Sequence, residues 1–171
     1  MKNYKVLFAD LDGTLIETIS GATFPKGTWD MRLKFDVLDR IKELKPELVA
    51  IVTNQGGIEK GFVDERNFVK GKMSYVTRSI EEYAGCRCIF NYCISNDKDC
   101  RFRKPNIGML ETVIHKNFNQ LGIEAAKEDM LMIGDASGKE GQFSDSDKRT
   151  AENFDIDYLD VEDFVKAMKG E

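Results

Sequence analysis

Long apolar runs, an excess of positive charge and an export signal are all lacking from this sequence. Its wholly apolar runs, such as residues 48–52, fall far short of the roughly 18 to 20 residues that a membrane-spanning helix needs. The 25 Lys and Arg stand against 30 Asp and Glu, a net charge of -5, which excludes a protein that coats nucleic acid through its overall charge. We therefore predict a cytoplasmic protein with no membrane partner, whose contacts with phosphate groups are local.

Histidine is scarce and cysteine is clustered. The single histidine, His115, lies between apolar positions of a predicted helix, so we interpret it as a surface or packing residue rather than a ligand. The four cysteines, Cys86, Cys88, Cys93 and Cys100, occupy one short window. Because no secretory signal precedes them, we expect reduced thiols rather than a disulfide framework, with a metal site as the competing interpretation.

Short β-branched or apolar runs alternate with longer segments of helical period, which predicts an α/β fold built on a parallel sheet. The expected strands cover residues 5–9, 48–52, 88–94, 130–133 and 156–159. The expected helices cover residues 36–45, 64–83, 110–121 and 160–169. Because the chain has 171 residues and no Pro/Gly-rich linker, we expect residues 1–171 to form one domain. Two segments without a clear period, a flap at about 14–30 and a loop at 136–146, are candidate active-site loops.

Two aspartates follow the first predicted strand directly. Asp10 and Asp12 are two positions apart, so they leave the strand end on the same side. Two carboxylates this close raise the cost of ionising each other unless a cation or hydrogen bonds compensate. The pair indicates a metal site or acid-base chemistry, and a solvated acidic turn is the alternative interpretation.

Further polar groups follow three other predicted strands. Thr53 and Asn54 end the second strand, before a glycine-rich turn whose N–H groups could hold an anion. Lys104 precedes Pro105 near the start of a predicted helix, where an anion would meet both the lysine and the helix dipole. Asp135 ends the fourth strand. Ligands of open α/β sheets bind at the carboxyl ends of the strands, so these groups are expected to share one crevice. Their hard oxygen ligands favour Mg²⁺.

Four segments of the sequence resemble the motifs of a known superfamily. The four segments Asp10-x-Asp12-Gly13-Thr14, Thr53-Asn54, Lys104-Pro105 and Gly134-Asp135 resemble, in order, the four motifs of the haloacid dehalogenase (HAD) superfamily, most of whose members are phosphatases. The flap sequence, with Ser20-Gly21 and Phe24-Pro25, resembles the 3′-phosphatase domain of polynucleotide kinase/phosphatases. This resemblance implies a Rossmann-like parallel five-stranded sheet with helices on both faces and without a large cap domain.

The resemblance also implies a role for each motif residue. Asp10 would be the nucleophile that forms an aspartyl-phosphate, and Asp12 the acid that protonates the leaving hydroxyl and then activates water. The residues expected to bind the phosphoryl oxygens are Thr53, Asn54 and Lys104. Mg²⁺ would be held by Asp10, the backbone carbonyl of Asp12, and Asp135. Asp147 resembles a further acidic position that steadies the metal shell, and Asp145 is its rival.

The substrate implied by this resemblance is the 3′-phosphate of a nucleic-acid end, as in DNA repair. The intervals between the motifs leave little room for a lid domain, so an uncovered crevice could admit a polymer end. Candidate contacts with the nucleic-acid backbone are Lys26, Arg32, Lys34 and Lys60, although all four could be ordinary surface residues. Trp29 could stack on a base or pin the flap. The phosphate-binding pattern Gly-x-x-x-x-Gly-Lys-[Ser/Thr] of kinases does not occur, so we expect any kinase or ligase partner to be a separate protein.

Two other functions compete with this prediction. A related branch of the superfamily, which acts on histidinol phosphate and sugar bisphosphates, carries a four-ligand zinc loop before its Arg-Lys-Pro segment. Here Cys93 and Cys100 occupy two of the four ligand places while Ser95 and Phe102 occupy the others, so we do not expect zinc. A small-molecule phosphatase stays as the alternative. A receiver domain of a signalling system is a more distant one, because no acidic residue ends the third predicted strand.

Overall fold

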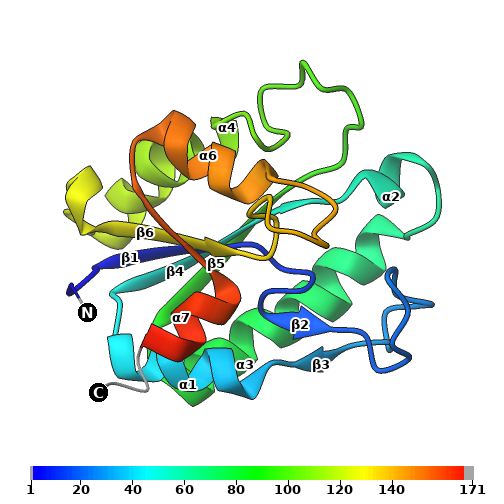
Figure 1. The fold of residues 1–171 in the computed structure, drawn as a ribbon, viewed down its shortest axis with the longest axis horizontal. Coiled ribbons are helices and arrows are strands. Elements are labelled where there is room, and N and C mark those ends of the chain that lie inside the picture. The colour runs from blue at the N-terminus through cyan, green and yellow to red at the C-terminus, as the bar shows by residue number, and fades with distance from the viewer. Residues whose placement is uncertain (1, 168–171) are drawn as a thin grey trace.

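The computed structural model describes residues 2–167, and its centre is a parallel sheet of five strands (Figure 1). In chain order these strands are β1 (Val6–Ala9), β4 (Leu48–Asn54), β5 (Arg87–Cys93), β6 (Met130–Gly134) and β7 (Asp157–Asp160). They lie in the order β5-β4-β1-β6-β7. All four pairings are parallel, so every strand ends at the same edge of the sheet. The predicted fold class and the five predicted strands are confirmed.

Helices cover both faces of the sheet. One face carries α1 (Phe35–Leu44), the π-type helical segment η1 (Asn67–Met73), α3 (Ser74–Ala84) and α7 (Val161–Ala167). The other carries α4 (Gly108–Thr112), η2 (Val113–Phe118), α5 (Asn119–Leu121) and α6 (Ser146–Phe154). The alternation of β1 explains this layering, because Leu7 packs into the first layer and Phe8 into the second. Figure 1 shows the two helical layers on opposite sides of the strands.

Three of the predicted helices are found with only small shifts in their ends. Asp64 caps the helical segment that precedes α3, because its carboxylate accepts the N–H of Asn67 at 2.8 Å. Residues 168–169 of the predicted C-terminal helix lie outside the described residues. A helix at α6 was not predicted, since few of its residues are apolar and only Ala151 and Phe154 of these are buried. Two short elements complete the chain: α2 (Gly56–Glu59) and η3 (Lys127–Asp129).

The segment between β1 and α1 forms a small flap. Its two short strands, β2 (Ile16–Glu17) and β3 (Arg32–Leu33), pair antiparallel. Asp30 holds the loop between them, since its carboxylate accepts the Ser20 N–H at 2.8 Å, the Ser20 hydroxyl at 2.7 Å and the Lys26 N–H at 2.9 Å. These hydrogen bonds lower the pKa of Asp30 to about 2. Among residues 2–167, no helix is long and apolar enough to cross a bilayer.

Candidate active site

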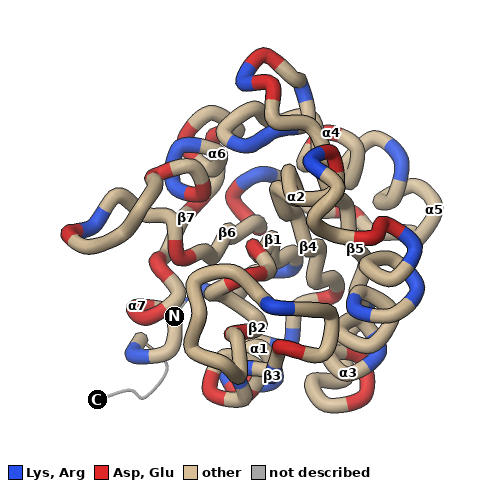
Figure 2. The backbone as a smooth tube through the Cα atoms, turned by 90° about the vertical axis from the view of Figure 1, so that its right-hand side faces the viewer, with Lys and Arg blue, Asp and Glu red and all other residues tan. Residues whose placement is uncertain are grey.

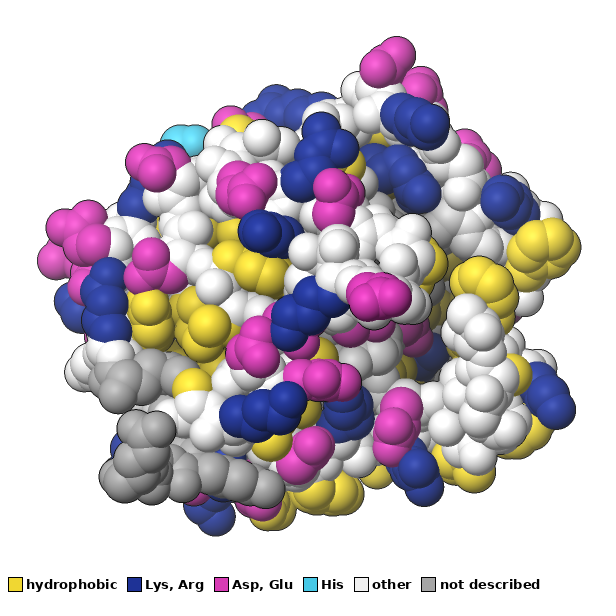
Figure 3. All heavy atoms as spheres, viewed as in Figure 1, with side chains coloured by type: hydrophobic (Ala, Val, Ile, Leu, Met, Phe, Trp, Pro, Cys, Tyr) yellow, Lys and Arg dark blue, Asp and Glu magenta, His cyan; other side chains and the backbone are white. Residues whose placement is uncertain are grey.

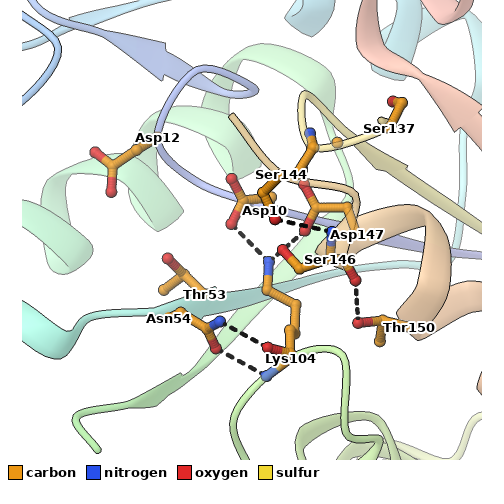
Figure 4. Close-up of polar contacts among 12 residues, drawn as sticks. Asp10, Asp12, Thr53, Asn54, Lys104, Ser137, Ser144, Ser146, Asp147 and Thr150 are labelled. Atoms are coloured by element: carbon orange, nitrogen blue, oxygen red, sulfur yellow. Dashed lines mark hydrogen bonds and ion pairs between the residues drawn. The ribbon is translucent and has the colours of Figure 1, made fainter. Parts of the chain in front are cut away.

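The four polar strand ends predicted from the sequence meet at the carboxyl edge of the sheet. Asp10 directly follows β1, Thr53 lies in β4, and Asp135 directly follows β6. Lys104 comes from the loop after β5, and its side chain reaches between these strands (Figure 4). The strands β1, β4 and β6 are almost wholly buried, so the backbone that carries Asp10, Thr53 and Asp135 is held by the core.

Lys104 lies at the centre of the site. Its Nζ is 2.7 Å from Oδ1 of Asp10 and 2.6 Å from Oδ1 of Asp147 (Figure 4). The side chains of Lys104 and Asp147 are each only 2% exposed. Burial alone would lower the pKa of this lysine, but the two carboxylates outweigh burial and raise it. Lys104 is therefore a fixed positive charge at the bottom of the crevice.

Asn54 holds the backbone of Lys104. Its Nδ2 donates to the Lys104 carbonyl at 3.1 Å, and its Oδ1 accepts the Lys104 N–H at 2.9 Å. The sequence suggested that this side chain binds phosphoryl oxygens directly. In the structure its amide is directed to the loop that carries Lys104 and fixes the backbone of that lysine.

Three carboxylates converge beside Lys104. Asp10, Asp135 and Asp147 each offer an oxygen within 4.8 Å of the others. Burial raises the pKa of Asp10 well above its ordinary value, in spite of the opposing charge of Lys104. Burial, together with the charge of Asp147, raises the pKa of Asp135 to about 6. Three carboxylates against one lysine leave an excess of negative charge, which a cation would neutralise.

Two glycines make room for this cluster. A Cβ on Gly13 would lie 2.0 Å from Oδ2 of Asp135, and its φ of +79° is one that favours glycine. A Cβ on Gly134 would lie 2.2 Å from Oδ2 of Asp147. The first and fourth motifs therefore need glycine, because any larger residue at Gly13 or Gly134 would collide with a carboxylate of the cluster.

The choice between Asp145 and Asp147 is decided by their surroundings. Asp147 is 1% exposed and its two oxygens contact Lys104 and the N–H of Ala136. Asp145 is exposed and precedes α6. Asp147 is therefore the acidic residue of the loop that belongs to the site.

Asp12 lies apart from the Lys104 cluster (Figure 4), and its side chain is 47% exposed. One of its oxygens accepts a hydrogen bond from Nε2 of Gln55 at 2.9 Å, and the same nitrogen donates to the Thr53 hydroxyl at 2.9 Å. Its other oxygen is 3.5 Å from Nζ of Lys72. Gln55 and Lys72 were not predicted as site residues, and they are the two partners of this carboxylate.

The four candidate basic contacts differ in their placement. Lys34 is half-buried and its Nζ donates to the Gly13 carbonyl at 3.1 Å, so it belongs to the wall of the site rather than to an outer rim. Arg32 pairs with Glu17 at 2.7 Å on the flap surface. Lys26 and Lys60 are exposed. Basic and acidic positions are interspersed along the backbone in the view of Figure 2.

Exposed aromatic side chains accompany the flap. Trp29 is 67% exposed and Phe24 is 81% exposed. Trp29 therefore does not pin the flap by burial, and its alternative role in stacking on a base stays a prediction. Figure 3 shows hydrophobic side chains beside the hollow on the right-hand side of the molecule.

The cysteines divide between the two sides of the sheet. Cys93 and Cys100 approach each other, with 3.8 Å between their sulfurs, on the side of α4. Cys86 and Cys88 pack into the core on the opposite side. Burial raises the pKa of both Cys86 and Cys88. His115 is exposed on η2.

This fold and this arrangement of motifs define a phosphatase of the HAD superfamily. Comparison with solved structures agrees on the fold: the chain matches the D,D-heptose 1,7-bisphosphate phosphatase of B. bronchiseptica, solved with magnesium and phosphate, with a TM-score of 0.65. The match has 20% sequence identity and covers 90% of this chain and 78% of the other.

Within that superfamily, the chain belongs to the polynucleotide kinase 3 phosphatase family, whose sequence profile matches residues 5–165. A bifunctional polynucleotide phosphatase/kinase of Schizosaccharomyces pombe is 30% identical over 166 residues, which cover 95% of this chain and 38% of that protein. A 20.8 kDa protein of Autographa californica nuclear polyhedrosis virus is 30% identical over 173 residues, covering 96% of this chain and 87% of that one. The D-glycero-beta-D-manno-heptose-1,7-bisphosphate 7-phosphatase of Haemophilus influenzae is 29% identical over 146 residues, covering 77% and 71%.

Proposed function

We propose that this protein is a Mg²⁺-dependent phosphomonoesterase that removes the 3′-phosphate from nucleic-acid ends. The observation that carries the proposal is the match to the polynucleotide kinase 3 phosphatase family along nearly the whole chain. The form of the crevice supports it, since within residues 2–167 only the short flap and α1 lie between β1 and β4. A crevice without a large cover admits a polymer end more readily than it encloses a small metabolite.

The residues present fit Mg²⁺. Asp135 offers carboxylate oxygens that Lys104 does not contact, Asp10 has a second oxygen besides the one that attacks phosphorus, and the Asp12 carbonyl follows on the same turn. Oxygen ligands of this kind suit Mg²⁺. When bound, the ion would neutralise the excess negative charge and polarise the phosphoryl oxygens. Asp147 would support the site by holding the ammonium group of Lys104.

Asp10 is the proposed nucleophile. Lys104 holds Oδ1 of Asp10 at 2.7 Å, which orients the carboxylate and leaves Oδ2 to attack phosphorus. As the bond from Oδ2 to phosphorus forms, the bond from phosphorus to the 3′ oxygen breaks, giving an aspartyl-phosphate. Lys104 and the Thr53 hydroxyl would then face the phosphoryl oxygens and stabilise the charge that develops on them.

Asp12 is the proposed acid and base. It gives its proton to the departing 3′ oxygen, and in the second step it takes a proton from the water that attacks the aspartyl-phosphate. That step releases phosphate and restores the Asp10 carboxylate. The 47% exposure of the Asp12 side chain suits this role, because the carboxylate must meet both the leaving group and water.

A sugar-bisphosphate phosphatase is the second candidate function. Two similar proteins favour this function, because the relative from H. influenzae and the solved structure from B. bronchiseptica are both named as heptose bisphosphate phosphatases. The same chemical steps would apply, and only the leaving group would differ. The basic positions Lys26, Arg32 and Lys60 would then have no part in binding.

Under the leading proposal, Lys26, Arg32 and Lys60 contact the nucleic-acid backbone. A separate kinase or ligase then acts on the dephosphorylated end.

A substrate panel separates the two functions. Phosphate release is measured with Mg²⁺, and with EDTA as a control, from an oligonucleotide with a 3′-phosphate, the same oligonucleotide with a 5′-phosphate, histidinol phosphate and a heptose bisphosphate. We expect selective release from the 3′-phosphate. Turnover of a small phosphate with none from either oligonucleotide would overturn the polynucleotide assignment and leave the superfamily chemistry in place.

A further inference from the structure

Lys72 is a buried cation next to the active site that the steps above do not use. Its side chain is 6% exposed, and its Nζ is 3.5 Å from Oδ1 of Asp12. Among residues 2–167 this is the one ion pair of the Lys72 ammonium group. Burying a lysine is costly unless it is paired, so the contact with Asp12 accounts for its place.

The helix that carries Lys72 is irregular at this point. Lys72 lies in the π-type segment η1, between the buried residues Phe68 and Met73. Regular helix follows only from Ser74. Wide helical turns of this type are found frequently at functional sites. Here the turn directs one lysine toward Asp12, while Lys70 of the same segment is exposed.

Gln55 holds the other oxygen of the same carboxylate. Its Nε2 is 2.9 Å from Oδ2 of Asp12 and 2.9 Å from the Thr53 hydroxyl. Each oxygen of Asp12 therefore has its own partner, one from η1 and one from the turn after β4. The carboxylate is half exposed, so without these two partners it would be free to turn toward solvent.

We propose that Lys72 and Gln55 are positioning residues, which hold the Asp12 carboxylate where the leaving-group oxygen departs. This inference rests on the acid-base role proposed for Asp12. It assigns two cations to two sides of the reaction: Lys104 faces the phosphoryl group, and Lys72 supports the group that protonates the leaving oxygen. A proton donor that is misplaced by even a small distance loses much of its effect.

The test compares leaving groups in single turnovers with enzyme in excess, so that only the first step is measured. An alkyl leaving group, as in β-glycerophosphate or a 3′-phosphorylated oligonucleotide, needs a proton, whereas nitrophenol from p-nitrophenyl phosphate departs without one. In Lys72→Met we expect release of the alkyl group to slow by roughly 10- to 100-fold, a part of what general acid catalysis supplies. We expect nitrophenol release to change less than about twofold.

Three further variants complete the design. Lys70→Met, from the same segment, is the matched control and should behave as wild type. Lys72→Arg should recover part of the alkyl rate, because it restores the charge beside Asp12. If Lys72→Met does not fold, as judged by circular dichroism, Gln55→Ala tests the same idea at a half-buried position with the same expected contrast.

The results that would overturn the proposal are distinct from failure of the proposed substrate. Equal loss of the alkyl and nitrophenyl rates, or an effect on KM alone, would assign Lys72 to phosphate binding rather than to Asp12. Unchanged alkyl rates in both Lys72→Met and Gln55→Ala would remove any role. If the wild type hydrolyses small phosphates but no oligonucleotide, the 3′-phosphatase assignment fails, and the contrast between β-glycerophosphate and p-nitrophenyl phosphate still decides the role of Lys72.

Discussion

Replacement of Lys104 by methionine is the perturbation whose effect on folding follows most directly from the structure. Methionine keeps the length and the apolar stem of the lysine and removes its charge. The ammonium group has two carboxylate partners at 2.7 and 2.6 Å, and one of them, Asp147, is itself 1% exposed. Removal of one member of a buried ion pair costs about 3–5 kcal/mol, because the remaining charge is left without compensation.

That loss is large for a chain of this size. For domains of about 150–250 residues, 1 kcal/mol shifts Tm by about 2–4 °C, so Lys104→Met should lower Tm by roughly 6–20 °C. The assay is thermal unfolding at pH 7 in EDTA, followed by circular dichroism, with Lys148→Met at an exposed position as the control.

A double variant tests the cause of this loss. Adding Asp147→Asn to Lys104→Met removes one of the two carboxylate charges that the lysine compensated, while the new amide oxygen can still accept the N–H that Ala136 donates to the Asp147 carboxylate at 3.1 Å. We expect the double variant to be more stable than Lys104→Met alone. A Tm within about 2 °C of wild type for Lys104→Met, or a double variant less stable than the single one, would refute the argument that Lys104 compensates buried carboxylates.

Three other predictions concern the carboxylates. Asp10→Asn should abolish turnover while the protein stays folded, and Asp12→Asn should bind metal but turn over far more slowly; near-normal activity of Asp10→Asn would contradict the assignment of the nucleophile. In the folded, metal-free protein the pKa of Asp135 is about 6, above its ordinary value of 3.8. Protonation of this carboxyl therefore stabilises the metal-free fold at low pH, and the stabilisation is lost as the pH rises through 6. Mg²⁺ binds the ionised carboxylate, so it offsets this loss at high pH. Mg²⁺ at about 100 times its Kd should therefore raise Tm by roughly 5–10 °C at pH 8 and by less at pH 5, and an equal rise at both would be evidence against this site. Asp30→Ala should make the flap more sensitive to proteolysis without unfolding the sheet, and unchanged cleavage would show that its three hydrogen bonds do not hold the flap.

The sheet and the set of motif residues were predictable because their signals are local. Each strand is a short apolar run, and the groups that end the strands are brought together by parallel topology alone. Lys104 and Asp135 could thus be assigned to one crevice from the sequence alone. The amphipathic pattern of α1 and α3 is equally plain, since each helix has one buried stripe.

The remaining features depend on contacts that no local pattern encodes. Lys72 lies in a helical segment where a lysine ordinarily faces solvent, and only the wide turn of η1 directs it toward Asp12. The resemblance favours Asp147 and leaves Asp145 as its rival, and the burial of Asp147 decides between the two. Lys34 resembles a surface lysine in sequence, yet the pairing of the two flap strands brings it to the Gly13 carbonyl.

The contacts of Asn54 with the Lys104 backbone could also not be predicted from the sequence. Its neighbour Thr53 faces the site, and the motif gives no reason to treat the two side chains differently. The structure separates them, because the amide of Asn54 matches the backbone N–H and carbonyl of Lys104 fifty positions away. Pairing across such a distance is a property of the fold and is not visible in a spacing.

Under the proposed function, phosphate passes through a covalent bond to Asp10, and trapping that bond tests this step. Asp12→Asn protein is mixed with Mg²⁺ and p-nitrophenyl phosphate, whose leaving group needs no proton, so that the aspartyl-phosphate accumulates when its hydrolysis is slowed. The acyl-phosphate is then reduced with borohydride and the peptides are analysed by mass spectrometry. We expect a reduced side chain at position 10 alone, and none in EDTA. Reduction at another aspartate, or phosphate release with no trapped residue under conditions where turnover continues, would contradict it.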